Sequence, residues 1–301
     1  MFDSRHIKTF HEVVRTGSYS AAARALGYTQ PAITQQMKAL EREVGSPLFI
    51  RAGRGLRLSE AGEALSRHAA AILGSMSAAQ EQIHALTRLR AGRVRVCAFP
   101  SAHTTIVPET MARLAARHPG VRVDLLDDEP PESLQRLVRG ECDITLAFTY
   151  PGLHEYVPDE LVEIPLLEDQ LTVLLPAGHP LARRRTVQLT DVAQERWIAG
   201  CLRCRANLLH ECAEQGFAPE IAFTTDDGLA LQAMVAEGLG VAMVPALVLN
   251  FLCHPRVTGR PLQPASRRKV FAYVLREHLR IPATALVLEE LKTVAANKSG
   301  C

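Results

Sequence analysis

The sequence lacks the features of an exported, membrane-spanning or disulfide-stabilised protein. Its longest apolar run, from Gly238 to Cys253, contains Pro245 and Asn250 and falls short of the ~20 residues that a spanning helix needs. The first residues, MFDSRHIKTFHEVV, carry mixed charges and no apolar stretch typical of a secretion signal. Seven cysteines, an odd number, in a chain of 301 residues indicate free thiols in a reducing compartment. We therefore expect a cytoplasmic protein without membrane contact.

Motifs of the common enzyme classes are also missing. The sequence has no G-x-S-x-G nucleophile elbow, no phosphate-binding P-loop and no H-E-x-x-H metal motif. The triplet GLG at 238–240 lacks the rest of a dinucleotide-binding fingerprint. We therefore expect neither an enzyme nor a resident cofactor.

The formal net charge of +2 is unevenly distributed along the chain. Residues 1–92 hold 12 Lys and Arg against 7 Asp and Glu, a net of +5. Residues 93–301 hold 22 against 25, a net of −3. Positive charge is thus concentrated in the N-terminal third, which favours a polyanionic partner there.

Three short helical patterns precede residue 45. Asp3 or Ser4 can cap the first, Ser18 the second and Thr29 the third. Gly27 can end the second helix in a left-handed conformation. A tight turn between the second and third helices is typical of a helix-turn-helix motif, whose second helix enters the major groove of DNA.

The third helix has one apolar and one polar side. At ~100° per residue, Ile33, Met37, Leu40 and Val44 fall within an arc of roughly 60°, which predicts a buried stripe. Amide and hydroxyl groups can bond to base edges, and cations can neutralise phosphates. A face that is merely solvated is the alternative. The polar residues of interest are Gln30, Thr34, Gln35, Lys38 and Arg42.

The next segment, PLFIRAGRGLRLSEAG, predicts a small hairpin beside the third helix. Leu48-Phe49 and Leu56/Leu58 flank a turn at Gly53-Arg54-Gly55. Such a wing would place the arginines at 51, 54 and 57 along the phosphate backbone. A simple basic loop is the alternative.

A long helix should follow, capped by Ser59 and running to about Leu89. Apolar residues recur alternately every four and three positions, which is the a/d repeat of a seam for another helix. We expect a second copy of the chain to occupy that seam, and packing on the chain's own domain is the alternative. Two copies would present two recognition helices to a site with dyad symmetry. The seam residues are Leu65, Ala69, Ile72, Met76, Ala79, Ile83 and Leu86.

From Gly92 onward, strand and helix patterns alternate, which predicts an α/β fold with a largely parallel sheet. We expect helices at 107–118 and 206–215 and a strand at 270–276. The chain should form two lobes that enclose a cleft. The expected divisions are a DNA-binding domain at 1–58, a linker helix at 59–90, lobe one at about 91–160 and 266–301, and lobe two at about 161–265.

The stretch TGSYSAAARALGYTQPAITQQMKALEREVGSPLFIRAGRGLRLSEAG resembles the DNA-binding signature of LysR-type transcriptional regulators. PAGHPLA, WIAG and VAEGLGVAMVP are similar to landmarks of the family's effector domain. The resemblance implies a winged helix-turn-helix joined by a long linker helix to a two-lobed, periplasmic-binding-protein-like α/β effector domain. It also implies a homo-oligomer, usually a tetramer, that binds promoter DNA and alters its contact with RNA polymerase when a small molecule enters the cleft.

The resemblance also suggests individual site residues. Gln30, Pro31 and Thr34 match positions that meet DNA in the family, and Arg51 and Arg54 match the wing. Gln35 stands where many members have arginine, a departure that changes the expected base from guanine to adenine. Oriented N–H groups at a helix start suit a carboxylate effector. The effector candidates are Ser101, Thr104, Thr149, Arg203 and Thr225, and Pro100 and His103 are local departures.

The segment GCLRCRANLLHECAEQG brings three cysteines and a histidine within a short distance along the chain. Cys201, Cys204 and Cys212, with His210, could bind zinc or form a disulfide switch. Peroxide-sensing members of the family carry two reactive cysteines in this region, but with a different spacing. Burial as ordinary core residues is the alternative. A bilobal solute-binding protein or an enzyme on that fold would be a further alternative, although neither explains residues 1–60.

Overall fold

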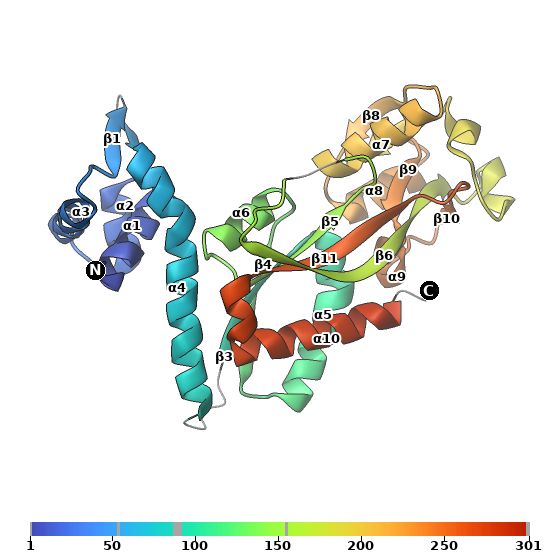
Figure 1. The fold of residues 1–301 in the computed structure, drawn as a ribbon. Coiled ribbons are helices and arrows are strands. Elements are labelled where there is room, and N and C mark those ends of the chain that lie inside the picture. Colours follow the sequence, from blue (N-terminus) through green and yellow to red (C-terminus); the bar gives the residue numbers. More distant parts are fainter. Residues whose placement is uncertain (1, 53–54, 87–91, 154–155, 299–301) are drawn as a thin grey trace.

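The computed structural model describes residues 2–52, 55–86, 92–153 and 156–298 of the chain. Three helices and a hairpin form the N-terminal domain, as predicted (Figure 1). Asp3 Oδ1 accepts a hydrogen bond from the N–H of Arg5 (2.9 Å), and Ser18 Oγ accepts one from the N–H of Ala21 (3.1 Å). Gly27 ends the second helix with φ 68°, a conformation that glycine adopts without strain. The elements are α1 (Ser4–Thr16), α2 (Tyr19–Leu26), α3 (Gln30–Val44), β1 (Phe49–Ala52) and β2 (Gly55–Leu58).

The linker helix α4 (Glu60–Leu86) leaves this domain and runs along lobe one (Figure 1). Ser59 caps it, because its Oγ accepts a hydrogen bond from the N–H of Gly62 at 3.1 Å. A side chain at Gly62 would lie 2.1 Å from the carbonyl oxygen of Leu48. Glycine therefore lets the start of the helix pack directly on the backbone just before β1. The predicted end near Leu89 lies outside the described residues.

The main sheet, which follows the linker helix, is mostly antiparallel, so the expectation of a largely parallel sheet is wrong. Its strand order is β10-β6-β11-β5-β3-β4, with β9 also paired to β6. Among its described strands, β3 pairs in parallel with β4 and β5, whereas the pairs made by β6 and β11 are antiparallel. The strands β6 and β11 run in opposite directions, and β6 continues beyond residue 170 to pair with β9 and β10. The strands are β3 (Gly92–Ala98), β4 (Val121–Asp127), β5 (Ile144–Thr149), β6 (Leu161–Pro176), β9 (Ala242–Pro245), β10 (Val257–Pro261) and β11 (Arg267–Leu275).

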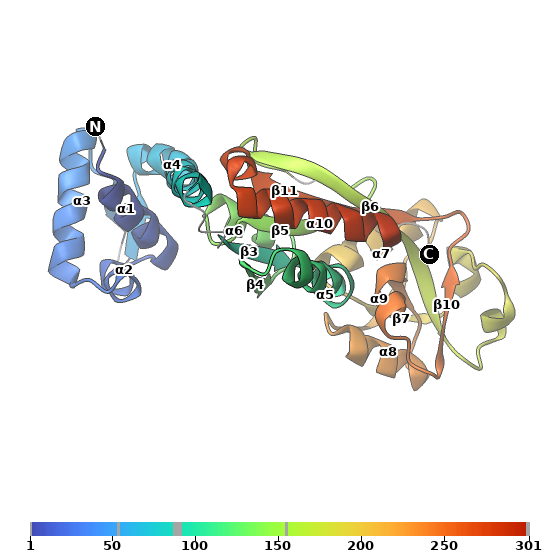
Figure 2. The same cartoon turned by 90° about the horizontal axis from the view of Figure 1, so that it is seen from below.

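Two further strands, β7 (Arg196–Ala199) and β8 (Glu220–Thr224), pair in parallel in lobe two. Several helices surround the sheets (Figures 1 and 2). They are α5 (Pro100–Arg117), α6 (Glu132–Val138), α7 (Leu202–Glu214), α8 (Gly228–Ala236), α9 (Ala246–Phe251) and α10 (Pro282–Lys298), with 3-10 turns η1 (Pro180–Arg183), η2 (Leu189–Val192) and η3 (Arg276–Arg280). No helix in the described part of the chain has the length and apolar character needed to cross a membrane.

Two helices begin earlier than the sequence suggested, and both starts bear on the interlobe region. The helix expected at 107–118 begins at Pro100, because proline fits a first turn where no N–H is required. The helix then continues through Pro108. The helix expected at 206–215 begins at Leu202, because the side chain of Cys201 caps it. The expected strand at 270–276 likewise begins three residues earlier, at Arg267.

The strands β6 and β11 connect the two lobes. Residues 161–170 of β6 pair with β11, and residues 171–176 pair with β9 and β10. On its other side β11 pairs with β5. One continuous core includes Phe148, Leu171 and Trp197. The crossing point near residue 169 is thus a packed junction at which side chains of both lobes can meet.

Candidate functional site

The helix α3 buries one side and exposes the other. Ile33, Met37 and Leu40 are at most 1% exposed, so the predicted stripe packs against α1 and α2. Figures 1 and 2 show α3 on the side of the molecule remote from the effector domain. Its outer surface is therefore available to a partner as long as DNA.

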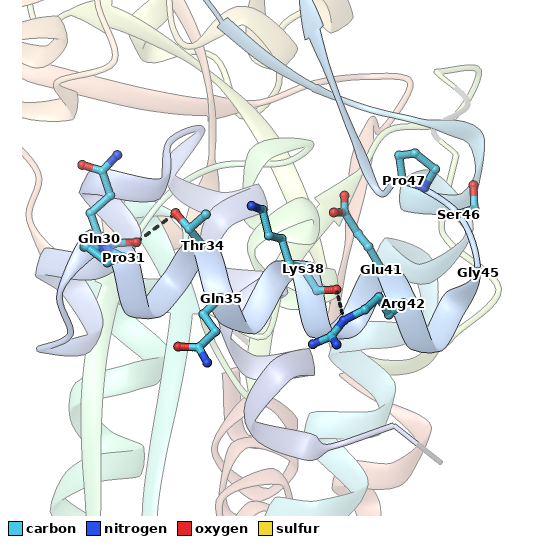
Figure 3. A pocket seen from close by; sticks show the side chains of 10 residues that line it. All are labelled: Gln30, Pro31, Thr34, Gln35, Lys38, Glu41, Arg42, Gly45, Ser46 and Pro47. Atoms are coloured by element: carbon cyan, nitrogen blue, oxygen red, sulfur yellow. Dashed lines mark hydrogen bonds between the residues drawn. The ribbon is translucent and has the colours of Figure 1, made fainter.

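The outer surface of α3 forms a shallow groove that ends at the turn leading into β1 (Figure 3). Gln30, Pro31, Gln35 and Lys38 are exposed, and Thr34 is half-buried. The groove thus collects the helix residues that the sequence singled out. Its lining consists of Gln30, Pro31, Thr34, Gln35, Lys38, Glu41, Arg42, Gly45, Ser46 and Pro47.

Hydrogen bonds orient several side chains of this groove. Gln30 Oε1 accepts a bond from Ser20 Oγ at 2.9 Å, which ties α3 to α2. Thr34 Oγ1 donates to the carbonyl of Gln30 at 3.0 Å. The acidic member, Glu41, accepts a bond from the N–H of Leu48 at 2.9 Å and so holds the start of β1. Arg42 Nε donates to the carbonyl oxygen of Lys38 at 3.3 Å (Figure 3).

The predicted wing is present as the antiparallel pair β1–β2. Arg51 lies on β1, opposite Leu56, and Arg57 is exposed on β2. Arg54 lies outside the described residues.

The predicted seam of α4 divides into two parts. Leu65 and Ala69 are buried and belong to the core of the N-terminal domain, with Ile72 partly buried against it. Intramolecular packing, the alternative interpretation, therefore applies to this half. Met76 is 42% and Ile83 58% exposed. The exposed part also includes Ala79, and Leu86 is not among the side chains described.

The opposite side of α4 contacts lobe one. Gly74 faces the ring of His278, and a Cβ at Gly74 would lie 2.7 Å from its Nε2. Ala78 is 5% exposed and joins the main core. The linker is thus packed on lobe one along one side. Its exposed seam residues, Met76, Ala79 and Ile83, lie on the solvent side, where another copy of the chain could bind.

A buried ion pair lies where β6 and β11 cross. The strand register places Arg268 opposite Asp169. The guanidinium donates to Asp169 Oδ2 from Nε (3.0 Å) and Nη2 (2.8 Å), and Nη2 also donates to Ser101 Oγ (2.8 Å). It lies over the rings of Phe99 (5.0 Å) and Phe148 (4.8 Å). A buried charge needs such partners, and here they come from three separate segments.

The first turn of α7 reaches this ion pair from lobe two. Arg203 Nη2 donates to the carbonyl oxygen of Phe148 at 3.2 Å, and its guanidinium lies 5.5 Å from the ring centroid. The hydroxyl of Tyr150 donates to Cys204 Sγ at 3.5 Å. His210 of the same helix lies against Gly152. One side of α7 therefore contacts the end of β5 and the residues just after it.

Cys201 and Cys204 form a contact of their own within that turn. The two sulfurs are 2.9 Å apart, and Cys201 Sγ accepts a bond from the N–H of Cys204 at 3.4 Å. Donation from the Cys201 thiol lowers the pKa of Cys204 to about 7. Burial raises this pKa, whereas the hydroxyl of Tyr150 and the charge of Arg268 lower it further. Hydrogen bonding to Cys204 and burial raise the pKa of Cys201. Glu129 lies beside Cys201, and burial raises the pKa of its carboxyl.

The third predicted cysteine does not join this pair. Cys212 is fully buried in the main core, eight residues after Cys204 on the same helix and so about 12 Å along its axis. Burial raises its pKa to about 12. In the described ranges no three or more His, Cys, Asp and Glu side chains are grouped to hold a metal ion. The metal alternative for these cysteines therefore has no support there.

The other effector candidates lie around the same junction. Thr104 is exposed, and its hydroxyl donates to the carbonyls of its own helix. Thr149 is half-buried at the end of β5, opposite Lys269. The N–H of Thr225 donates to Ala199 two residues before Cys201 (3.0 Å). Ser101 contacts Arg268, and Arg203 contacts Phe148, over whose ring Arg268 lies. We call this group of side chains around the buried ion pair the Arg268 cluster. Thr104 points away from it.

Sequence reasoning missed four members of the cluster, which are Arg268, Asp169, Tyr150 and Glu129. One signal was available. Asp169 precedes the apolar run LTVLL, and a charge in such a strand is usually paired. Its partner was not visible, because Arg268 is 99 residues distant along the chain.

Comparisons with known proteins agree with this architecture. Residues 4–63 match the family described as bacterial regulatory helix-turn-helix protein, lysR family, and residues 87–296 match the LysR substrate binding domain. A probable HTH-type transcriptional regulator, LrrA of Synechococcus elongatus, is 29% identical over 285 residues and covers 94% of each chain.

Solved structures show the same fold. A full-length OxyR from Pseudomonas aeruginosa, in a variant with one cysteine replaced by aspartate, has a TM-score of 0.77 at 19% identity, covering 97% of this chain and 95% of its own. Full-length CbnR complexed with its target DNA has a TM-score of 0.56 at 22% identity, covering 98% and 100%. The two family matches together take in nearly all of the described residues. The chain belongs to the LysR family of DNA-binding transcriptional regulators, with an effector-binding domain behind its helix-turn-helix.

Proposed function

We propose that the outer face of α3 reads the base edges of promoter DNA and that the wing holds the phosphate backbone. The observation that carries this proposal is the solvent-facing groove lined by Gln30, Thr34, Gln35 and Lys38 on a helix whose other side is fully buried. Short polar side chains at a helix N-terminus suit direct readout, and Lys38 suits a phosphate. We infer a regulatory and not an enzymatic role for the chain as a whole, in the cytoplasm.

The test is fluorescence anisotropy of the full-length protein with DNA from upstream of its own gene, over a series of salt concentrations. Thr34→Ala should reduce discrimination between matched and altered sequences by about 1–3 kcal/mol. Thr293→Ala is the matched control, because its hydroxyl makes the same bond to the carbonyl four residues earlier (2.8 Å) on the remote helix α10. Equal effects of both changes would remove Thr34 from the interface.

The phosphate contacts need a different variant. Lys38→Ala should weaken binding to all sequences and reduce the salt slope by about 0.9. Arg54→Ala should act in the same way from the wing. Lys292→Ala on α10 removes a remote surface charge, which is paired with Glu289 at 2.9 Å. If Lys292→Ala changes the salt slope as much as Lys38→Ala does, the effect comes from net charge and not from contact.

We further infer a homodimer built on the exposed half of α4, and a tetramer built from two such dimers. Met76, Ala79 and Ile83 supply the apolar surface. Two α3 helices would then face a DNA site with dyad symmetry. The resulting promoter complex would alter its contact with RNA polymerase.

The effector is proposed to be a small carboxylate held between the lobes. Ser101 lies in the first turn of α5, at the positive end of the helix dipole, which favours an anion. Arg203 reaches the same junction from α7. A guanidinium and a hydroxyl on opposite lobes allow one carboxylate to bridge them and change the angle between the lobes.

A thermal-shift screen of small carboxylates on the full-length protein tests this inference. A bound carboxylate should raise the Tm of the wild type and of Arg205→Met, an exposed neighbour on α7 that serves as the control. The rise should be lost in Arg203→Met and reduced in Ser101→Ala. A rise that persists in both site variants would place the carboxylate elsewhere.

A further inference from the structure

The first turn of α7 holds two thiols in the geometry from which a disulfide can form. Cys201 caps the helix and Cys204 lies one turn later, with the sulfurs 2.9 Å apart. A disulfide bond is about 2.05 Å long, so closure needs a movement of less than about 1 Å. Both residues are partly accessible, in contrast to the fully buried Cys212.

The surroundings select one of the two thiols as the nucleophile. Cys204 Sγ accepts from the thiol of Cys201 and from the hydroxyl of Tyr150, and it lies near the positive charge of Arg268. Cys201 lies beside the carboxyl of Glu129, which disfavours a second negative charge. Donors and a nearby cation stabilise a thiolate. Cys204 is therefore the attacking sulfur and Cys201 the resolving one.

We propose that Cys201 and Cys204 form a reversible intramolecular disulfide, with a low-molecular-weight disulfide as the oxidant, and that this bond adjusts the contact between the lobes. The regulatory meaning of the bond rests on the interlobe effector site proposed above. The chemistry of the bond does not rest on it.

The exchange proceeds in two balanced steps. The Cys204 thiolate attacks one sulfur of the oxidant, forms a mixed disulfide and expels one small thiolate. Cys201 then gives up its proton and attacks Cys204 Sγ, which releases the second small thiolate. Both expelled thiolates end as thiols, so two protein thiols are oxidised and one small disulfide is reduced.

Closure changes the interlobe contact in a defined way. The thiolate of Cys204 disappears, so the hydroxyl of Tyr150 loses a charged acceptor and the Arg268 cluster loses one negative neighbour. Arg203 lies between the two cysteines in the chain and holds the carbonyl of Phe148 at 3.2 Å. Oxidation therefore acts on the same turn that carries the proposed effector contact.

The test is equilibration of the full-length Cys253→Ser protein with mixtures of reduced and oxidised glutathione. The substitution removes the cysteine that is exposed among the described residues, which could form an unrelated mixed disulfide. Free thiols are trapped with N-ethylmaleimide, and peptide masses are read. We expect one Cys201–Cys204 disulfide that rises to full occupancy as oxidised glutathione increases and disappears on reduction. Free thiols at both positions throughout, or stable glutathione adducts without closure, would overturn the proposal.

A second measurement tests the local chemistry without any oxidant. Thiolate absorbance in the ultraviolet, with Cys204→Ser as the blank, gives the ionised fraction of Cys204. Tyr150→Phe keeps the ring packing on Phe148 (5.5 Å) but removes the hydroxyl. Loss of this donor should raise the pKa of Cys204. A rise of about one unit would lower the ionised fraction at pH 7 about fivefold. Tyr273→Phe is the control, because that hydroxyl donates to Glu163. An unchanged fraction in Tyr150→Phe contradicts the assignment of the attacking sulfur.

These experiments contain no DNA, and at fixed total glutathione the concentration of its carboxylates is the same in every mixture, so the disulfide yield reports on the thiols. A failure to form the disulfide therefore refutes the redox control and leaves the proposed DNA and effector sites standing. A failure of the DNA and carboxylate experiments, with a disulfide that forms as expected, would refute the proposed sites and leave the dithiol chemistry in place.

Discussion

The buried pair at the crossing of β6 and β11 provides a direct test of what holds the two lobes together. Arg268 is 2% exposed, and Asp169 offers it two hydrogen bonds at 3.0 and 2.8 Å. Asp169→Asn keeps the shape of the side chain and an oxygen for the N–H of Leu247, which Asp169 Oδ1 accepts at 3.1 Å. It removes the charge and replaces Oδ2, the acceptor of both bonds from Arg268, with an NH2 donor. An unpaired guanidinium in the core should then cost about 3–5 kcal/mol.

That loss is a large part of a typical stability of about 5–15 kcal/mol. The double variant Arg268→Met with Asp169→Asn should recover most of it. It leaves no unpaired charge, and methionine can fill the space between the rings of Phe99 and Phe148. The double-mutant cycle should therefore show strong coupling between the two positions.

Urea unfolding followed by the fluorescence of Trp197 measures these effects. Trp197 is the single tryptophan of the sequence and is fully buried on β7, so its signal reports on the core of lobe two. Glu168→Gln is the control, because that neighbour is exposed and its pairing with Arg267 (3.1 Å) should contribute less than about 1 kcal/mol. If Asp169→Asn behaves like Glu168→Gln, or if the double variant loses the sum of both single losses, the electrostatic account of the junction is wrong.

Two further predictions concern the linker helix. Met76→Glu with Ile83→Glu should give monomers in light scattering, because two charges would enter the exposed apolar half of α4. The control, Met76→Leu with Ile83→Leu, should keep the native oligomer. An unchanged oligomer in the charged variant would exclude this surface as the dimer contact. Gly74→Ala should lower the Tm, because the new Cβ would lie 2.7 Å from the buried ring of His278. This clash should outweigh the preference of alanine for a helix, which is worth up to about 1 kcal/mol. An increase in Tm would show that the linker does not pack there.

Local signals in the sequence predicted most of the N-terminal domain. A cap is formed within a few residues of the helix that it stabilises, so Asp3, Ser18 and Gly27 could be assigned without knowledge of the fold. The amphipathic period of α3 likewise fixed which side chains face outward. The contact between Cys201 and Cys204 belongs to the same class, because residues three apart are neighbours on a helix. Cys212 shows the limit, since closeness in sequence did not bring it to the pair.

Long-range pairing could not be predicted in the same way. The alternation of strands and helices favoured a parallel sheet, but the directions of β6 and β11 depend on how the chain returns between the lobes. The register that sets Arg268 opposite Asp169 joins segments 99 residues apart. No periodicity or cap encodes such a pair, and only the rule that a buried charge needs a partner points to it. The centre of the proposed interlobe site was therefore missed, while residues at its edge, Ser101 and Arg203, were named.

The pH dependence of stability offers a final check on the cysteine pair in the reduced protein. The folded chain releases the proton of Cys204 at about pH 7, whereas an ordinary thiol keeps it until about pH 9. Between these values the unfolded chain binds more protons, so stability should rise with pH, by on the order of 2 kcal/mol. Above about pH 9 the unfolded chain releases both protons, but folded Cys201 retains its own, because its pKa is raised. Stability should then fall again.

The expected result is thus a maximum near pH 9 in the difference between the wild type and the variant Cys201→Ser with Cys204→Ser. The measurement is urea unfolding under a phosphine reductant, which contributes no thiols of its own. Other titrating groups act in both proteins and cancel in the difference. A difference that is flat from pH 7 to 9 would mean that Cys204 is not ionised in the folded protein. A steady decline over that range would mean that burial raises the pKa of both thiols. Either result would remove the physical basis for a nucleophile at the start of α7.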